Sequence, residues 1–356
     1  GLYGSGKVLV LDEPTAVVSE ADSEHLLQRL NALREQGMAI LYVTHRLTEV
    51  LTIADRVTVL RDGRKVAENA RAEVTREGLI RHMTKVSASS TPTTDGTAAP
   101  GGDAPASGSG SGRPHALTQA SGSEVRVEAL HAPPSVVQAS LTLRPGRVAG
   151  IVGVQGSGHG DLLHALAGLR DYDGTVDVAG RRLAPGSVAS ARRAGVRLVP
   201  GDRRRAAIAA HLSLADNVAL SSATSSRFGF RRRRTERASA AGYVATMDVR
   251  PPSTGAKAGS LSGGNQQKIA IANALESQPR VLLLEEPTQG VDVMGKVEIR
   301  KLIRALARSG RCVAIATSEF EDLPDYVDDI YVMRLGRLHG PVPPEQATYE
   351  RLLHAA

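Results

Sequence analysis

Two pairs of adjacent carboxylates in this sequence each follow a short run of apolar residues. Asp12 and Glu13 follow VLVL in the segment VLVLDEPT. Glu285 and Glu286 follow VLLL in the segment VLLLEEPT. A carboxylate at the carboxyl end of a parallel strand can hold Mg²⁺ beside nucleotide phosphates, and the next carboxylate can orient or deprotonate a water. An acidic residue after a strand can also cap a helix, so the pairs alone leave both roles open.

The segment LSGGNQQK at 261–268 is the most specific motif in the chain. Gly263 and Gly264 let backbone N–H groups approach a phosphate closely, and Ser262 adds a hydroxyl donor. The residues that follow predict a helix, whose N-terminus attracts anions. A serine-capped helix start is the alternative interpretation, and the VLLLEEP that comes soon after argues against it.

A second glycine-rich segment, GVQGSGHG at 153–160, follows the apolar run RVAGIV and precedes the helical run DLLHALAGL. This strand–loop–helix order is the context that a phosphate loop requires. Gly153, Gly156 and Gly158 are present, and we predict that they and His159 face nucleotide phosphates. His159 replaces the usual Lys, which removes a fixed positive charge. Gly160 replaces Ser or Thr, which removes a hydroxyl contact to Mg²⁺.

The two acidic pairs belong to a longer internal repeat with an offset of 273 residues. The offset continues without a gap for more than fifty residues. Corresponding positions include two glycines predicted to end a helix and two aspartates, namely Gly37 and Gly310, and Asp55 and Asp328. A single motif match could arise by chance, but a constant register over this length indicates duplicated elements.

Each copy of the repeat predicts a strand, a helix and a second strand. One buried helix face is marked in both copies by apolar residues at i, i+4 and i+7. These residues are Leu26, Leu30 and Leu33 in the first copy, and Ile299, Ile303 and Leu306 in the second. An apolar strand follows each helix, at Met38–Val43 and Cys312–Ala316. This order implies βαβ units in a parallel sheet, whose strand ends would position the carboxylates.

The first residues, GLYGSGK, fit a phosphate loop except that Val8 stands where Ser or Thr is expected. A phosphate loop leads into a helix, whereas this segment leads into the strand VLVLDE. In the repeat it aligns with ALESQPR at 274–280, the end of a helix and the turn before VLLLEE. The equivalent of the loop at Gly153 would lie about 120 residues before Gly1, so we expect an N-terminally truncated fragment or a disrupted copy.

Residues 87–122 contain few apolar side chains and are rich in Ser, Thr, Gly, Ala and Pro. Such a segment buries too little surface to offset the entropy of ordering it, so it is predicted to be a disordered linker. It separates residues 1–86 from residues 123–356. The second of these parts is long enough for a domain with its own core.

The composition narrows the class of protein. The net charge of +7 and pI near 9.7 suit an anionic partner, but an Arg-rich solvated surface is the favoured explanation. FGFRRRRTER at 228–237 lacks a recognisable nucleic-acid-binding module. No apolar run approaches the ~18 residues of a membrane span, so any membrane role would be peripheral. The one cysteine, Cys312, lies in the apolar run CVAIA and is predicted to be buried, and a single cysteine excludes an internal disulfide.

Together these motifs resemble those of the ATP-binding subunits of ATP-binding-cassette (ABC) transporters. LSGGNQQK resembles the family's signature motif, and DEPT and EEPT resemble its Walker B motifs. The order LSGGNQQK, EEPTQGVDV, TSE is similar to that of the tandem ATPases of ribose, galactose and xylose importers. The resemblance covers residues 1–86 and 123–356. It implies an α/β fold of the ABC-type P-loop NTPases with a mainly parallel core sheet, comprising part of a first nucleotide-binding domain and a complete second one.

In that family two nucleotide-binding domains dimerise head to tail, so that each ATP lies between the Walker motifs of one and the signature of the other. The resemblance implies that Asp12 binds Mg²⁺ and that Glu13 is catalytic. It also identifies His45, in VTHRLTEV, as the switch histidine that contacts the γ-phosphate. The signature residues that would contact ATP are Ser262, Gly263, Gly264 and Gln266.

The second Walker site departs from the family pattern beyond its phosphate loop. Glu285 replaces the usual Asp at the Mg²⁺ position; its longer side chain can reach the metal, although the octahedral geometry is demanding. Glu286 is retained. Ser318 stands where the first copy has His45. We therefore expect this site to bind nucleotide weakly and to hydrolyse it poorly.

The segment LVPGDRRR at 198–205 aligns with the family's Q-loop, which contacts the membrane subunit. Related members usually show Glu-Asp-Arg here. In this chain Gly201 replaces the Glu, while Asp202 and Arg203 remain. The resemblance thus implies a contact with a permease near Asp202.

The resemblance predicts an ATPase that energises import of a simple sugar, with ATP and Mg²⁺ as cofactors. Its partners would be integral-membrane permease subunits and, indirectly, an extracytoplasmic sugar-binding protein, with no nucleic acid. Its location would be the cytoplasmic face of the cell membrane. The competent site would need the absent phosphate loop, so we expect little ATPase activity from this chain alone.

Three alternatives remain open. The chain could serve a nucleoside importer, since GVQGSG also resembles loops in those proteins. It could be a non-transport cassette ATPase, such as a translation or repair factor, although those usually carry two intact Walker loops. Finally, it could be a remnant whose second domain folds and binds nucleotide without turnover.

Overall fold

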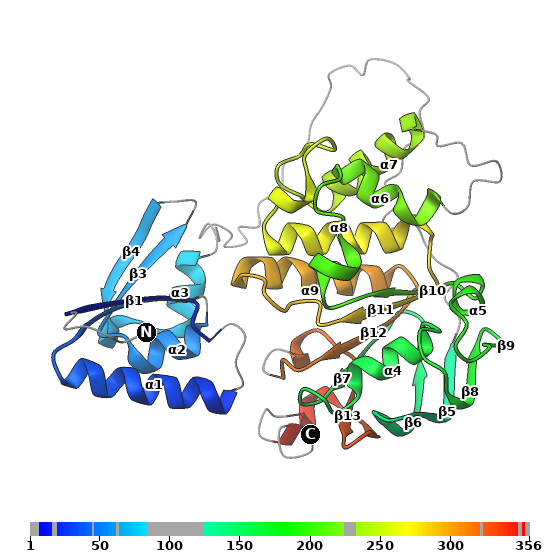
Figure 1. Ribbon diagram of the computed structural model, residues 1–356, viewed down its shortest axis with the longest axis horizontal. Helices are drawn as coiled ribbons and strands as arrows, with labels where there is room; N and C mark the ends of the chain where they lie inside the picture. The colour runs from blue at the N-terminus through cyan, green and yellow to red at the C-terminus, as the bar shows by residue number, and fades with distance from the viewer. Residues whose placement is uncertain are drawn as a thin grey trace, which may run out of the picture. The chain divides into compact units, whose positions relative to one another are not determined.

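The computed structural model describes residues 7–15, 20–44, 46–61, 64–83, 124–223, 233–320, 323–347 and 351–352. The chain divides into two compact units, one on each side of the segment 84–123 (Figure 1). The predicted linker at 87–122 lies within that segment, and like His45 it falls outside the described residues.

The described residues of the N-terminal unit form two separate two-stranded sheets and three α-helices. Its described elements are β1 (Val8–Asp12), α1 (Glu20–Glu35), β2 (Ala39–Val43), α2 (Leu47–Ile53), β3 (Arg56–Arg61), β4 (Arg64–Ala70) and α3 (Arg76–Met83). Strand β1 pairs with β2 in parallel, and β3 pairs with β4 in antiparallel. Its cores are correspondingly small, and the one beneath β1 and β2 is centred on Leu27, Leu30 and Ile53.

The C-terminal unit is built on one sheet of ten strands. Its strands are β5 (Val125–Ala132), β6 (Val136–Leu143), β7 (Val148–Val152), β8 (Asp173–Val178), β9 (Arg181–Arg182), β10 (Val196–Val199), β11 (Val281–Glu285), β12 (Cys312–Thr317), β13 (Asp329–Arg334) and β14 (Arg337–Val342). Its α-helices are α4 (His159–Leu166), α5 (Val188–Arg193), α6 (Leu214–Ala223), α7 (Arg233–Thr246), α8 (Gly263–Glu276) and α9 (Val293–Arg308). The strand order is β10-β11-β12-β7-β13-β14-β6-β5-β8-β9.

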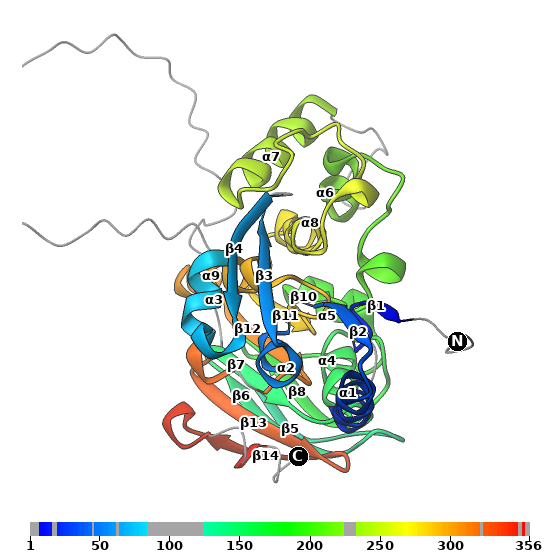
Figure 2. The same ribbon diagram turned by 90° about the vertical axis from the view of Figure 1, so that its left-hand side faces the viewer.

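The part of this sheet from β10 to β13 is parallel throughout, as the sequence predicts. An antiparallel part formed by β6, β5, β8 and β9 continues it. Figures 1 and 2 both place α6 and α7 beyond α8, at the end of the unit opposite to β5 and β6. The fold is therefore an α/β core extended by an antiparallel sheet at one end and by helices at the other.

The central strands are buried on both faces because each face packs against helices. Side chains alternate along a strand, so successive residues of β11 enter different cores. Val281 and Leu283 join one core together with Leu162 of α4. Leu282 joins the other core, which includes Ile299 of α9.

The internal repeat is reproduced in three dimensions. The bounds of β1, α1 and β3 coincide with those of β11, α9 and β13 at the same offset. The pairing Val8↔Ala39 in the first copy corresponds to Val281↔Cys312 in the second. Gly37 and Gly310 follow the two equivalent helices with positive φ, +88° and +93°, a conformation that favours glycine after a helix end.

The two copies differ in how one sheet face is covered. Val8 is 66% exposed and Val10 is 62% exposed on β1, and Leu41 is 58% exposed on β2. Val281, the equivalent of Val8, is 1% exposed. The C-terminal unit covers this face with α4, and no described element of the N-terminal unit does so.

Candidate functional site

The glycine-rich loop lies between β7 and α4, in the strand–loop–helix context predicted for it. A side chain at Gly153 would overlap the Ser157 hydroxyl and the Met333 carbonyl. A side chain at Gly158 would overlap the Ser135 carbonyl. The glycines therefore allow a tight turn between β7 and the start of α4, and a helix start is a region suited to phosphate.

Glu286 lies where β7, β11 and β12 end at one edge of the sheet. Its Oε2 accepts a hydrogen bond from the Thr317 hydroxyl at 2.9 Å, and its Oε1 accepts one from the Ser318 N–H at 2.7 Å. Burial raises the pKa of Glu286, but hydrogen bonds from His159, Thr317 and Ser318 outweigh it and lower the pKa overall. The structure thus holds an ionised carboxylate at this edge.

His159 occupies the position of the phosphate-loop lysine and is buried. Its Nδ1 lies 3.0 Å from the Ser157 hydroxyl, and its Nε2 lies 3.4 Å from Oε1 of Glu286. Both ring nitrogens therefore have protein partners. His159 links the loop to the carboxylate, a contact that the sequence did not predict.

Glu285, the predicted Mg²⁺ ligand, is held by two donors. Its Oε2 accepts from Nε2 of His164 at 3.1 Å and from the Gly201 N–H at 3.0 Å. The hydrogen bond from His164 lowers the pKa of Glu285, against the opposing effect of burial. The same bond raises the pKa of His164, against the lowering effect of its burial. Within the described ranges, no group of three or more His, Cys, Asp or Glu side chains is arranged to hold a metal ion.

The signature residues begin α8, as predicted. Ser262 caps the helix in an extended conformation and is exposed, and Asn265 donates to its hydroxyl at 2.9 Å. A Cβ on Gly263 would lie 2.6 Å from the Gly290 carbonyl oxygen. One on Gly264 would lie 3.2 Å from Cγ1 of Val291. Close packing against the loop after β11 therefore restricts Gly263 to glycine and leaves little space for a side chain at Gly264, independently of any ligand.

Gln266 faces the protein interior rather than the helix start. Its amide donates to the carbonyls of Ala258 and Leu261 at 3.3 and 3.2 Å, and the residue is 9% exposed. Its N–H₂ is thus committed to the preceding loop, and the contact of Gln266 with ATP stays a prediction. Gln266 fixes the segment that leads into Ser262.

Arg203 connects three segments around the signature. Its guanidinium donates to the Gln289 carbonyl at 2.6 Å and to the Gln267 side chain at 3.4 Å. It thereby joins the segment predicted to contact a permease, the loop after β11 and helix α8. Asp202, in the same segment, accepts from the Arg205 N–H at 3.2 Å and is exposed.

In the N-terminal unit, Glu13 adopts the backbone conformation of Glu286. The two residues have φ of +44° and +41°, and each N–H donates at 2.8 Å to the neighbouring strand, at Val43 and Ala316 respectively. Asp12 ends β1 and is exposed. The backbone of this acidic pair therefore repeats that of the second copy.

A buried carboxylate that the sequence did not predict supports this acidic pair. Glu49, in α2, is 4% exposed and accepts hydrogen bonds from the hydroxyls of Thr15 and Thr44 at 2.7 and 3.0 Å. Tyr42 also donates to Glu49 at 2.8 Å, and Arg46 forms an ion pair with it at 2.9 Å. Glu49 thus ties the segment after Glu13 to the strand end before His45.

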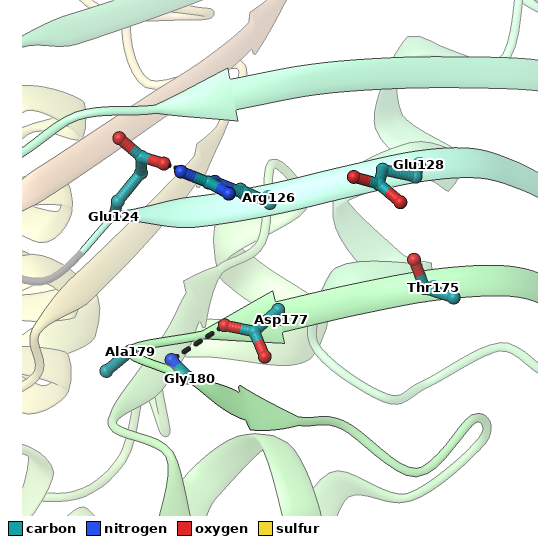
Figure 3. Close-up of a pocket in the computed structure, with 7 residues that line it drawn as sticks. All are labelled: Glu124, Arg126, Glu128, Thr175, Asp177, Ala179 and Gly180. Atoms are coloured by element: carbon teal, nitrogen blue, oxygen red, sulfur yellow. Dashed lines mark hydrogen bonds and ion pairs between the residues drawn. The ribbon is translucent and has the colours of Figure 1, made fainter.

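The structure brings some predicted site residues together and leaves others in separate units. Glu285, Glu286, His159 and the loop glycines meet in the C-terminal unit. Asp12 and Glu13 belong to the N-terminal unit and the signature to the C-terminal one, so their shared site stays a prediction. A hollow on the outer face of β5 and β8 contains none of these residues (Figure 3). Its lining residues are Glu124, Arg126, Glu128, Thr175, Asp177, Ala179 and Gly180.

Comparisons with known proteins agree with this geometry. Residues 136–289 match the family model described as ABC transporter. The ribose import ATP-binding protein RbsA 2 of Rubrobacter xylanophilus is 36% identical over 357 residues, which cover 100% of this chain and 65% of that protein. The arabinose import ATP-binding protein AraG 2 of Burkholderia thailandensis is 35% identical, over 100% of this chain and 64% of that protein. The xylose import ATP-binding protein XylG of Moorella thermoacetica is 32% identical, over 100% of this chain and 68% of that protein.

Solved structures show the same fold. An ATP-binding cassette of an ABC transporter, MJ1267, superposes with a TM-score of 0.58 at 18% identity, over 65% of this chain and 98% of that one. CbiO1 from Clostridium perfringens, part of the ABC transporter complex cbiONQ, superposes with a TM-score of 0.55 at 23% identity, over 64% of this chain and 92% of that one. The chain belongs to the ABC transporter family, as an ATP-binding protein of that family. It spans about two thirds of the length of the curated relatives named here.

Proposed function

We propose that this chain is the ATP-binding, ATP-hydrolysing part of an importer for a simple sugar. The observation that carries the proposal is similarity along the whole chain, across both units, to ATP-binding proteins named for ribose, arabinose and xylose import. Its partners are the permease subunits, with an extracytoplasmic sugar-binding protein acting indirectly, and it lies at the cytoplasmic face of the membrane. No described helix is long and apolar enough to cross a membrane.

The competent ATP site of this proposal is shared between two domains. Asp12 supplies a metal ligand and Glu13 orients the attacking water, while His45 contacts the γ-phosphate. Ser262 and Gly264 approach the same ATP from the signature side. The exposed end of β1 and the exposed start of α8 support these assignments, because both are accessible to a ligand. Mg²⁺ bound at Asp12 would neutralise phosphate charge.

The uncovered face of β1 and β2 supports a second part of the proposal. In the C-terminal unit the equivalent face packs against α4, the helix that follows the phosphate loop. We propose that β1 and β2 likewise receive a strand, phosphate loop and helix of the β7–α4 type, supplied by further sequence of the kind the longer relatives possess. Without it, Asp12 and Glu13 lack the loop that would hold the phosphates, so this chain alone hydrolyses little ATP.

ATP hydrolysis by two proteins tests this assignment. The first is the chain as given, and the second is the chain fused to the part of the ribose relative that it does not match, in which we expect the phosphate loop. We expect substantial turnover only from the fusion, and we expect Glu13→Gln to abolish it while Glu24→Gln, an exposed change on α1, preserves it. Turnover by the short chain that survives Glu13→Gln would refute the proposed site.

Substrate class is tested separately by uptake into vesicles that contain the fusion and its permease. Pentose uptake that depends on ATP would support the sugar assignment. Uptake of nucleosides with no pentose uptake would replace it with the nucleoside importer, and the absence of any permease complex would favour a non-transport ATPase.

A further inference from the structure

Three residues that differ from the usual family pattern lie together in the C-terminal unit, namely Gly160, Gly201 and Glu285. Gly160 stands where the loop pattern requires a hydroxyl residue. Glu285 stands at the Mg²⁺ position with one methylene more than Asp. Gly201 donates its N–H to Oε2 of Glu285 at 3.0 Å, and a Cβ on Gly160 would lie 2.6 Å from Oε1 of Glu285. The longer carboxylate thus fills the space that a side chain at 160 would take.

Gly201 closes the other side of the Glu285 side chain. A Cβ at position 201 would lie 3.3 Å from Cγ of Glu285 and 3.3 Å from Cβ of Glu286. That distance is tighter than ordinary carbon contacts, so a side chain here would press on the carboxylate. The two glycines therefore accommodate Glu285 together.

His164 completes the enclosure of this carboxylate. Its Nε2 donates to Oε2 of Glu285 at 3.1 Å. Its Nδ1 lies 3.9 Å from Asp161, which in turn pairs with Arg170 at 2.7 Å. The imidazole is thus fixed between two acidic side chains, and Glu285 receives donors where a cation would otherwise approach.

The donor set at this point does not fit Mg²⁺. The ion requires near-octahedral oxygen ligands at about 2.0–2.1 Å and dehydrates reluctantly. The hydroxyl at position 160 is absent, and Oε2 of Glu285 already accepts two N–H groups. Oε1 of Glu285 lies in the space beside Gly160. Oε2 would therefore have to give up an N–H donor before it could bind a metal ion, and the hydroxyl that would complete the ligand set beside Oε1 is missing.

We propose that the phosphate-loop site of the C-terminal unit excludes Mg²⁺ and takes nucleotide phosphates without metal. The inference rests on the proposed function only in that this site takes a nucleotide. The loop amides and the start of α4 provide the phosphate contacts. His164 and Gly201 satisfy the Glu285 carboxylate in place of the metal.

Nucleotide binding with and without metal tests the proposal. The chain of residues 1–356 carrying Asp12→Asn, which removes the proposed metal ligand of the N-terminal unit, is titrated with a fluorescent ATP analogue in MgCl₂ and in EDTA. We expect Kd values that agree within about twofold. The variant Gly160→Ser/Glu285→Asp, in the same background, restores the hydroxyl and shortens the carboxylate. We expect this variant to bind the ATP analogue about tenfold more weakly in EDTA. We also expect its nucleotide complex to bind Mn²⁺, which electron paramagnetic resonance would detect.

The outcomes separate this inference from the proposed function. Binding by the Asp12→Asn protein that requires Mg²⁺, or a protein-bound Mn²⁺ signal lost on Glu285→Gln, would overturn the inference alone. A different outcome is that neither the Asp12→Asn protein nor the Asp12→Asn/Gly160→Ser/Glu285→Asp protein binds nucleotide, in MgCl₂ or in EDTA. That outcome would overturn both the inference and the nucleotide-binding assignment of the C-terminal unit.

Thermal unfolding provides a check that needs no ligand. Gly160→Ser alone places a Cβ against Oε1 of Glu285, so we expect the unfolding midpoint to fall by about 3 °C or more. Adding Glu285→Asp should recover most of that loss, because the shorter side chain vacates the space. Additive losses in the double variant would show that the two positions are independent and would overturn the structural basis of the inference.

Discussion

Adjacent carboxylates in the second copy have different partners although their sequence context is shared. Glu286 is held by donors at the end of β12, which leaves it beside His159 and the phosphate loop. Glu285 is held by His164 and the Gly201 amide. Their separation follows from backbone geometry, since Glu286 adopts a φ of +41° and turns away from the strand direction. One carboxylate thus lies beside the phosphate loop, and the other contacts α4 and the segment that contains Gly201.

Substitution of Gly263 tests the packing role of the signature glycines. Its added Cβ in Gly263→Ala would lie 2.6 Å from the Gly290 carbonyl oxygen, so we expect a loss of about 1–3 kcal/mol in the free energy of unfolding. Gly242→Ala, within α7, is the matched control because its Cβ meets nothing within 4 Å. That variant should be neutral or more stable by up to about 1 kcal/mol. Equal effects in urea unfolding would contradict the packing argument.

The residues that sequence analysis identified are those whose roles depend on position along a strand or loop. The acidic pairs and the loop glycines belong to this group, because strand ends and tight turns are encoded locally. Glu49, His164 and Thr317 were missed, because their importance arises from contacts between segments far apart in the chain. The motif alone predicts that Gln266 contacts ATP, and the hydrogen bonds of its N–H₂ to the preceding loop could not be read from the sequence.

At the scale of elements, the repeat predicted β11, α9 and β12, and the context of the glycine-rich loop predicted β7 and α4. The apolar stripe of each helix and the run of each strand have periods that are visible in sequence. The coincident bounds of α1 and α9, Glu20–Glu35 and Val293–Arg308, confirm the register. The antiparallel part of the sheet was not predicted, because its strands β5, β6 and β8 lie outside the repeat.

Asp328, just before β13, contacts α9 and β7, and its carboxylate should make the stability of the fold depend on pH. It accepts hydrogen bonds from Arg304 of α9 and from the Val148 N–H of β7, both at 2.7 Å. Burial raises the pKa of Asp328, but these bonds and the charges of Arg304 and Arg147 lower the pKa overall. A lowered pKa means that the stabilisation is present above the unfolded-state value and is lost as pH falls through the folded-state pKa.

We therefore expect Asp328→Asn to reduce the free energy of unfolding by about 1–3 kcal/mol at pH 7. The difference between wild type and variant should shrink below about pH 4, as the wild-type carboxyl becomes protonated. Denaturant unfolding of both proteins between pH 3 and pH 8 measures this difference in the free energy of unfolding. A difference that stays constant across this range would show that the charge of Asp328 does not contribute.

At the scale of the whole molecule, the two units share the repeated strand–helix–strand segment but differ in how its sheet is covered. The C-terminal unit surrounds its parallel strands with helices on both faces, whereas the N-terminal unit leaves apolar residues of β1 and β2 exposed. Exposed apolar surface of this kind marks a site of association. This asymmetry supports the proposal that β1 and β2 complete a domain together with further sequence.

Two equivalent valines test the asymmetry. Val281→Thr introduces a hydroxyl into a fully buried strand face, and we expect it to cost about 1–3 kcal/mol in the free energy of unfolding. Val8→Thr makes the same change at the equivalent position, which is 66% exposed, and should stay within about 0.5 kcal/mol of wild type. A comparable loss of stability at both positions would mean that the first face is covered in solution.

Cys312 gives the chain a practical advantage. It is 0% exposed on β12, and burial raises the pKa of its thiol to about 12, so the reactive thiolate is scarce at neutral pH. Thiol-specific dyes and spin labels should therefore leave the native chain unmodified. A cysteine introduced at Glu24 and another at Ser262 would each be the single labelled position in its unit. Distances between such probes would report the movement of the two units during nucleotide binding, without a cysteine-free background having to be engineered first.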